Sequence, residues 1–196
     1  MKATLRRREV VRTLLAERGD LLVVAGLGST AWDCTAAGDS ALTFPLWGAM
    51  GVATMTGLGL ALAQPKRRVL VITGDGEMLM GLGTLATIAV QRPGNLAIAV
   101  IDNECYGETG MQATHTAHGV DLAAVARGCG FEGARVVWRD SGLKTACRAL
   151  RSGAGPVLVQ FKVVAEKLPL SLPPREGGLL KARFRRALLG PGADAE

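Results

Sequence analysis

The sequence predicts an α/β domain with a three-layer, doubly wound, mostly parallel sheet and helices on both faces. Short apolar runs alternate with longer helical stretches along the chain. The runs are nearly continuous in Val, Ile, Leu and Ala, which is typical of parallel strands covered on both sides. The 196 residues are enough for one well-buried core. A hydrophobic content of 48%, with 26 glycines and only 4% aromatic residues, also fits a compact α/β domain.

The first third of the chain is expected to contain two helices, two strands and a short helical turn. Charged residues such as Glu9, Arg12 and Glu17 interrupt the apolar residues near the start. This pattern predicts an amphipathic helix instead of a secretory signal peptide. A Gly-Ser-Thr turn at residues 28–30 is expected to open a short helix. In order, we expect helix Thr4–Arg18, strand Leu21–Ala25, the helix after Gly28, a small strand Leu42–Phe44, and a small-residue helix Gly48–Ala63 packed closely on its neighbours.

The rest of the chain repeats the alternation of strand and helix. An Asp is expected to begin the helix at residue 121, because aspartates are favoured at helix N-termini. The tail KLPLSLPPREGG is rich in Pro and Gly, so we expect it to leave the domain. The predicted elements are strand Val69–Thr73, helix Met78–Val90, strand Leu96–Asp102, an irregular stretch over 103–120, helix Asp121–Cys129, strand Ala134–Trp138, helix Gly142–Ser152, strand Pro156–Phe161 and helix Gly178–Leu189. We therefore expect one domain over residues 1–166, and a linker with a basic helix over 167–196.

Charge and composition argue against several classes of function. The longest weakly polar stretch, Trp47–Ala63, is shorter than the ~20 residues that a membrane span needs. The net charge of +6 arises mainly from basic residues at the two ends of the chain, including the triplet Arg6-Arg7-Arg8. Solvated basic helices explain this charge better than nucleic-acid binding, which favours a basic stripe with interleaved aromatics. The four cysteines form no C-x-x-C pair, which suits a cytoplasmic protein without an iron–sulfur or structural zinc site.

Two apolar strands end in side chains that carry oxygen atoms. Gly74-Asp75-Gly76 follows the first, and the second ends in Asp102-Asn103. Ligands of parallel sheets bind outside the carboxyl ends of the strands. Oxygen ligands from two neighbouring strands suit Mg²⁺, which also takes phosphate oxygens and water. A helix beginning after the glycines would direct free N–H groups at an anion. The pair therefore predicts a metal-bridged diphosphate site, whereas either ending alone would be read as a cap or a turn.

The spacing of the two endings resembles the motif of thiamine diphosphate (ThDP) enzymes. In this sequence 25 residues separate Gly-Asp-Gly from Asp102-Asn103, where the family has Asn or Asp in the first position. The stretch LWGAMG, residues 46–51, resembles a second family element. No P-loop and no complete G-x-G-x-x-G occurs, so the diphosphate is not expected to belong to ATP or NAD.

The resemblance implies a role for each matching residue. Gly48 would offer its carbonyl to the aminopyrimidine, and Met50 would hold ThDP in its bent shape. Asp75, Asn103 and the carbonyl of Cys105 would bind Mg²⁺, while Ser29 would offer a hydroxyl to the cofactor. The backbone near the diphosphate would come from Gly74, Gly76, Glu77, Gly107 and Glu108. His115 is a further candidate catalytic residue, because a histidine near ThDP could orient the substrate or shuttle protons, although the reading as a solvated loop histidine is somewhat favoured.

The chain resembles only the diphosphate-binding (PP) domain of these enzymes. Its pattern is closest to the sulfopyruvate and phosphonopyruvate decarboxylase group, whose second (PYR) domain carries the glutamate that protonates the aminopyrimidine. The resemblance therefore implies a hetero-oligomer with a separate PYR-type subunit that supplies this glutamate. An acetolactate-synthase-like carboligase, a 2-oxoacid oxidoreductase subunit and a non-catalytic cofactor-binding module remain alternatives. A phosphonate or sulfonate on the substrate would need cationic partners, and residues 69–134 contain only Arg92 and Arg127.

Overall fold

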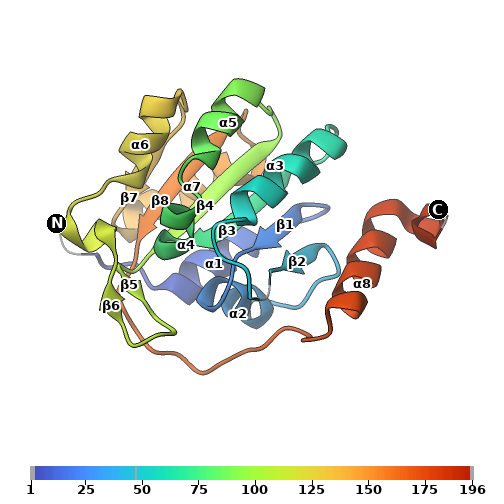
Figure 1. Ribbon diagram of the computed structural model, residues 1–196, viewed down its shortest axis with the longest axis horizontal. Helices are drawn as coiled ribbons and strands as arrows, with labels where there is room; N and C mark the ends of the chain where they lie inside the picture. Colours follow the sequence, from blue (N-terminus) through green and yellow to red (C-terminus); the bar gives the residue numbers. More distant parts are fainter. Residues whose placement is uncertain (1–2, 47, 195–196) are drawn as a thin grey trace.

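The computed structural model describes residues 3–46 and 48–194, and its centre is a six-stranded parallel sheet (Figure 1). Every pair of neighbouring strands in this sheet is parallel. In spatial order the strands are β2 (Thr43–Pro45), β1 (Leu22–Ala25), β3 (Val69–Gly74), β4 (Leu96–Asp102), β8 (Val157–Lys162) and β7 (Arg135–Val137). The predicted parallel sheet is confirmed.

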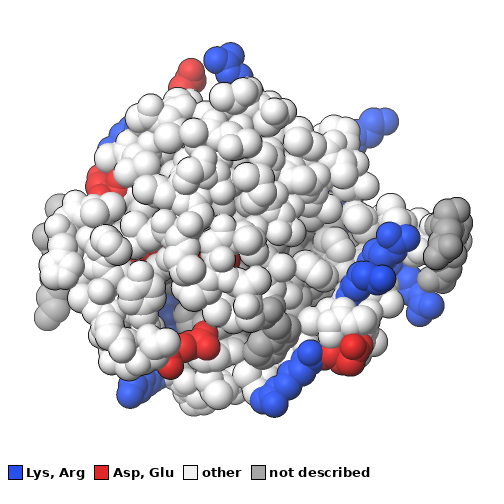
Figure 2. Space-filling model, viewed as in Figure 1, with Lys and Arg blue, Asp and Glu red and all other residues white. Residues whose placement is uncertain are grey.

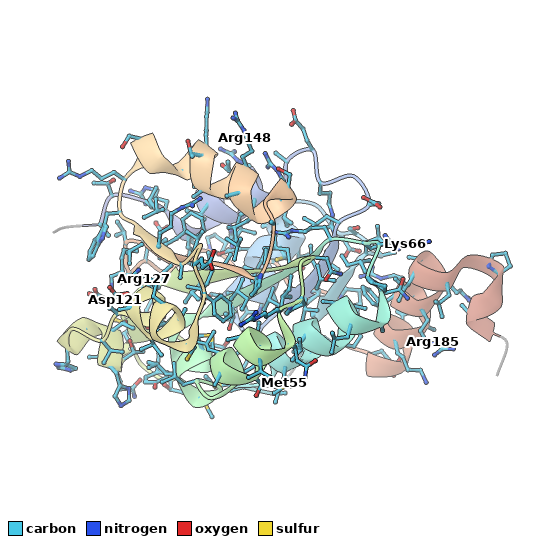
Figure 3. The ribbon with its side chains drawn as sticks, turned by 90° about the horizontal axis from the view of Figure 1, so that it is seen from above. Met55, Lys66, Asp121, Arg127, Arg148 and Arg185 are labelled. Atoms are coloured by element: carbon cyan, nitrogen blue, oxygen red, sulfur yellow. The ribbon has the colours of Figure 1, made fainter. Side chains whose placement is uncertain are left out.

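Helices cover both faces of the sheet and complete three layers. One face carries α1 (Arg7–Leu15), α2 (Ser29–Ala36) and α7 (Asp140–Ser152). The other carries α3 (Ala53–Ala63), α4 (Asp75–Met80), α5 (Thr84–Gln91) and α6 (Leu122–Cys129). Figure 3 shows this arrangement, with Arg148 of α7 and Met55 of α3 on opposite sides of the sheet. Alternate residues of each strand therefore join different apolar clusters, as Val23 and Val24 do.

The strand order creates a switch point between β1 and β3. The chain runs from β1 to β2 on one side and then returns to place β3 on the other side of β1. Connections on the two sides leave the sheet in opposite directions, so a crevice opens outside the carboxyl ends of these strands. Ala25 pairs with Ile72, and Gly74 pairs with Ile101, which brings the ends of β1, β3 and β4 together. This edge of the sheet is where the sequence predicted the site.

Two predicted helices differ from those in the structure, and backbone geometry explains both. The predicted helix Gly48–Ala63 begins only at Ala53, because Gly48 and Gly51 have φ of +68° and +80°, outside the right-handed helical range. The predicted helix Met78–Val90 is broken into α4 and α5. The break brings Gly81 against Gly51, so closely that an added Cβ at Gly81 would lie 2.2 Å from the Gly51 carbonyl oxygen.

The predicted first helix, Thr4–Arg18, is also shorter than expected. Leu5 pairs with Val163 in an isolated bridge, and Glu17 has a φ of +55°.

The irregular stretch after β4 contains a small hairpin and a 3₁₀ helix. Their bounds are β5 (Cys105–Tyr106), β6 (Gln112–Ala113) and the helix His115–His118.

The carboxyl-terminal part crosses from β8 to the opposite edge of the sheet. Residues 164–176, here called the strap, contain no regular structure and lead to α8 (Gly177–Leu189) and a 3₁₀ helix, Gly190–Asp194. Phe184 of α8 packs against Phe44 of β2 with ring centroids 5.4 Å apart, and Arg183 binds Asp39. The predicted division of the chain at residue 166 stays a prediction. Among the described residues, no helix is long and apolar enough to cross a membrane.

Candidate functional site

A cleft of about 530 Å³ lies at the carboxyl ends of β1, β3 and β4. Ten of the twelve residues predicted from the sequence line it. They are Ser29, Met50, Gly74, Asp75, Gly76, Glu77, Asn103, Cys105, Gly107 and Glu108. The fold thus brings together residues that are up to 79 positions apart in the chain (Ser29 to Glu108). What these residues bind stays a prediction at this point.

Asp75 lies at the first position of α4 and carries a buried, unpaired carboxylate. Its side chain is 2% exposed, and it forms no ion pair with any described cation. Its Oδ2 accepts hydrogen bonds from the hydroxyls of Thr114 (2.5 Å) and Thr116 (3.2 Å). Burial, with the nearby charge of Asp102, raises the pKa of Asp75 to about 6. A bound cation would stabilise the charged carboxylate, so this position fits the predicted Mg²⁺.

Asp102, at the end of β4, is held by protein groups instead. It is fully buried, and its Oδ2 accepts from Gln160 (2.6 Å) and Lys162 (3.0 Å) at the end of β8. Its Oδ1 accepts from Thr116 (2.8 Å). Burial opposes the charge of Lys162, but hydrogen bonds to Glu104 and Asp102 outweigh it and raise the pKa of Lys162. Since these donors already bind both carboxylate oxygens of Asp102, Asn103 is the better candidate for a metal ligand.

Asn103 begins the loop that carries the remaining predicted residues. Its Oδ1 accepts a hydrogen bond from the backbone N–H of Cys105 (3.1 Å), which closes a tight turn. The hairpin of β5 and β6 then extends across the cleft. Its tip holds Glu108, whose carboxylate lies so close to Gly28 that an added Cβ there would be 1.6 Å from Oε1. Burial raises the pKa of Glu108.

Gly76 allows the hairpin to pack on the first turn of α4. An added Cβ at Gly76 would lie 2.4 Å from Cε1 of Tyr106, so any larger residue would push the aromatic ring away. The small residue required by the motif therefore also has a packing role. It lets the β5 strand approach the backbone that the sequence predicts to face a diphosphate.

Glu77 is a second buried carboxyl group in the cleft wall. It is 4% exposed, and its Oε2 accepts from the Thr73 hydroxyl (2.9 Å). Oε1 has no hydrogen-bond partner among the described residues. Burial raises the pKa of Glu77, with the Thr73 hydroxyl and the backbone amides of Ala53 and Leu27 acting in the opposite direction.

Two predicted site residues do not line the cleft. His115 is exposed on its 3₁₀ helix, and Gly48 is exposed before α3. Trp47, which helped to carry the second family element, lies outside the described residues. The roles predicted for His115 and Gly48 remain predictions.

Sequence reasoning missed several groups that surround the cleft. Thr114, Thr116 and Lys162 act through tertiary contacts, although the polar residues in the otherwise apolar strand VLVQFK were a usable signal. The interpretation of the amino-terminal arginines as solvated is wrong for Arg7. Its side chain is 4% exposed and donates to Asp33 (2.5 Å) and to the carbonyl of Ser29 (3.2 Å). The burial of Asp33 on α2 draws this arginine inward.

Comparison with known proteins identifies the class to which this fold and cleft belong. The chain is a member of the thiamine pyrophosphate enzyme family: residues 27–161 match the family described as Thiamine pyrophosphate enzyme, C-terminal TPP binding domain. This match covers β2, β3, β4, β7, the hairpin and most of the residues that line the cleft. The family predicted from the two strand endings is therefore confirmed.

Within this family the chain is similar to sulfopyruvate decarboxylases and to phosphonopyruvate decarboxylases. It is 46% identical over 127 residues to the sulfopyruvate decarboxylase subunit beta of Methanothermobacter thermautotrophicus, covering 65% of this chain and 68% of that one. It is 37% identical over 182 residues to the phosphonopyruvate decarboxylase of Streptomyces viridochromogenes, covering 92% of this chain and 45% of that one. The predicted relationship to this group of decarboxylases is confirmed.

Solved structures agree on the fold. Benzoylformate decarboxylase from Polynucleobacter necessarius superimposes with a TM-score of 0.70 at 20% identity. The match covers 85% of this chain but only 34% of that enzyme. The chain thus corresponds to about one third of that longer protein, and the ThDP-binding α/β fold is confirmed.

Proposed function

We propose that the chain is the PP-type, beta subunit of a ThDP- and Mg²⁺-dependent decarboxylase that acts on a 2-oxoacid of the sulfopyruvate or phosphonopyruvate kind. The observation that carries the proposal is the convergence of ten motif residues on one cleft at the switch point of the sheet. The names of the similar proteins support the reaction and the substrate class.

The residues of the cleft divide the work of binding. Asp75, Asn103 and the carbonyl of Cys105 would hold Mg²⁺, which neutralises charge that the buried Asp75 carries alone. The backbone of α4 and of the hairpin tip would face the diphosphate, and Met50 would support the bent cofactor. When bound, ThDP supplies the nucleophilic carbon and the electron sink for the lost CO₂. The chain itself binds, orients and shields the cofactor.

A separate PYR-type subunit would supply the catalytic glutamate. An apolar surface beside the cleft fits such a partner: Val52, Met55 and Met80 are 42%, 43% and 63% exposed. Figure 2 shows that this face, over α3, α4 and α5, is almost free of charged side chains, which gather at the rim. Exposed apolar surface of this kind marks interaction sites. We also propose a cytoplasmic location, supported by four cysteines that are all free thiols.

Calorimetric titration with Mg²⁺ and ThDP tests the cofactor site. We expect Asp75→Ala and Asn103→Ala to abolish detectable binding, because each removes an oxygen ligand beside the diphosphate. Asp20→Ala is the matched control, since that side chain is 85% exposed and remote from the cleft. Unchanged affinity in a folded Asp75→Ala or Asn103→Ala variant would overturn the assignment.

Reconstitution tests the partner. The isolated chain should show no decarboxylase activity, and addition of a PYR-type subunit should restore it. Met80→Asp should prevent the association, whereas Val90→Asp, on a residue that is 78% exposed near the far end of α5, should allow it. Robust turnover by the pure isolated chain would contradict the proposal, and Glu77 would then be the first acid to substitute.

A further inference from the structure

The strap forms one wall of the cleft, and the amino-terminal arginines hold it in place. Glu166, Lys167, Leu168 and Leu170 all line the cleft. Arg6 forms an ion pair with Glu166, on one side of Lys167.

A second contact holds the strap on the other side of Lys167. Arg8 donates to the carbonyl oxygen of Pro169 (2.9 Å) and also binds Asp33 on α2 (2.9 Å). The side chain of Lys167 therefore projects from a segment that is fixed on both flanks to the rigid α1 and α2 layer.

Lys167 differs from the other cation among the described residues of the cleft lining, because its ammonium group has no protein partner there. Only two cationic residues, Arg7 and Lys167, appear among the described residues that line it. Arg7 already has protein partners, because its guanidinium binds Asp33, which it shares with Arg8, and donates to the carbonyl of Ser29. Lys167 is exposed and makes no hydrogen bond or ion pair with another described residue. An anion that enters the cleft thus meets one free positive charge.

We propose that Lys167 binds the second anionic group, a sulfonate or phosphonate, of the 2-oxoacid substrate. This inference rests on the function proposed above. Such a substrate loses one anionic group as CO₂ and keeps the other throughout the reaction, so a fixed cation can hold it before and after the chemical step. A lysine ammonium offers three rotatable donors, which suits a tetrahedral oxyanion. Residues 69–134 contain two cationic residues, Arg92 and Arg127, and neither lines the cleft.

The diphosphate of the cofactor also carries tetrahedral oxyanion groups, so it is the alternative ligand of Lys167. The predicted binding groups of the diphosphate come from α4, the hairpin, the Ser29 hydroxyl on α2 and the metal at the ends of β3 and β4. The strap approaches from a different element, after β8. We therefore assign Lys167 to the substrate, and the experiment separates the two ligands.

The test compares substrates with and without the second anionic group. The complex reconstituted with its PYR-type subunit is assayed with 3-phosphonopyruvate, 3-sulfopyruvate and pyruvate, and the Kd of Mg²⁺–ThDP is measured by calorimetry. Lys167→Met should lower kcat/KM for the two charged substrates by about tenfold relative to pyruvate, the loss of one charge-assisted hydrogen bond. Lys167→Arg should keep most of this preference. Lys144→Met, an exposed lysine on α7, should change nothing.

Each alternative outcome has its own signature. A tenfold weaker Kd for Mg²⁺–ThDP, with equal losses for all three substrates, would assign Lys167 to the diphosphate and overturn the inference. An unchanged preference in Lys167→Met would also overturn it while leaving the proposed function intact. A wild-type complex that accepts only pyruvate would overturn both this inference and the proposed substrate class, but not ThDP-dependent decarboxylation. A wild-type complex that binds Mg²⁺–ThDP but decarboxylates no 2-oxoacid would overturn the proposed function, and this inference with it.

Discussion

Replacement of Asp75 by Asn should stabilise the cofactor-free protein while it abolishes cofactor binding. Asp75 is buried without a cationic partner, and its pKa rises from 3.8 to about 6 on folding. Because one pKa unit corresponds to about 1.4 kcal/mol, the charged carboxylate costs the folded state about 3 kcal/mol. Asn removes this cost and can still accept the hydrogen bond from Thr114. Its amide N–H₂ needs a new partner, so we expect a net gain of about 2 kcal/mol.

The pH dependence identifies the cause of the gain. The folded-state pKa of Asp75 is raised, so its contribution to stability is fully present below about pH 4 and is lost as the pH rises through about 6. With EDTA and without ThDP, Asp75→Asn should melt about 4 to 8 °C above the wild type at pH 8. The difference should shrink strongly at pH 4.5.

The control is Asp20→Asn, because that carboxylate is 85% exposed and should show no such pH-dependent difference. Added Mg²⁺–ThDP should reverse the order by stabilising only the wild type. An Asp75→Asn protein that melts below the wild type at pH 8, or shows the same gain at both pH values, would refute this reasoning.

Two further predictions concern stability and are measured by urea unfolding. Asp33→Ala should cost about 3 to 5 kcal/mol, because it leaves a buried guanidinium without its carboxylate. Asp39→Ala, in a partly exposed ion pair, should cost less than about 1 kcal/mol, and equal losses would contradict the comparison. Gly81→Ala should cost at least about 2 kcal/mol, since its Cβ would lie 2.2 Å from the carbonyl oxygen of Gly51. Gly59→Ala, on an exposed helical position with open space, should instead stabilise by about 0.5 to 1 kcal/mol, so a neutral Gly81→Ala would argue against the close contact.

The sequence was informative wherever local pattern and strand order decide the outcome. The motif residues Asp75 and Asn103 follow directly from strands β3 and β4, and parallel pairing places strand ends at one edge of the sheet. Contacts between distant segments were not accessible in this way. Lys162 meets Asp102 across 60 residues, and the arginine triplet meets the strap across about 160. Neither local propensity nor spacing carries information on such pairs.

The prediction of one continuous helix across α4 and α5 was wrong for a related reason. Apolar periodicity continues past Gly81, but the helix ends where Gly51 approaches from another segment. Gly81 and Gly83 also weaken the helix locally, so the break has both a tertiary cause and a local signal that the prediction overlooked.

The strap also links a surface helix to the cleft wall without direct contact between them. It has no regular secondary structure of its own, so its position depends on attachments that include β8 at one end, Arg6 and Arg8 near its start, and α8 at the other end. The docking of α8 buries few residues, chiefly Leu180 and Phe184, and includes the Phe44–Phe184 ring pair and the Arg183–Asp39 ion pair beside β2. Local unfolding of α8 costs less than global unfolding and would slacken the strap. Amide protons of α8 and of the strap should therefore exchange with solvent as one cooperative unit, faster than those of the sheet.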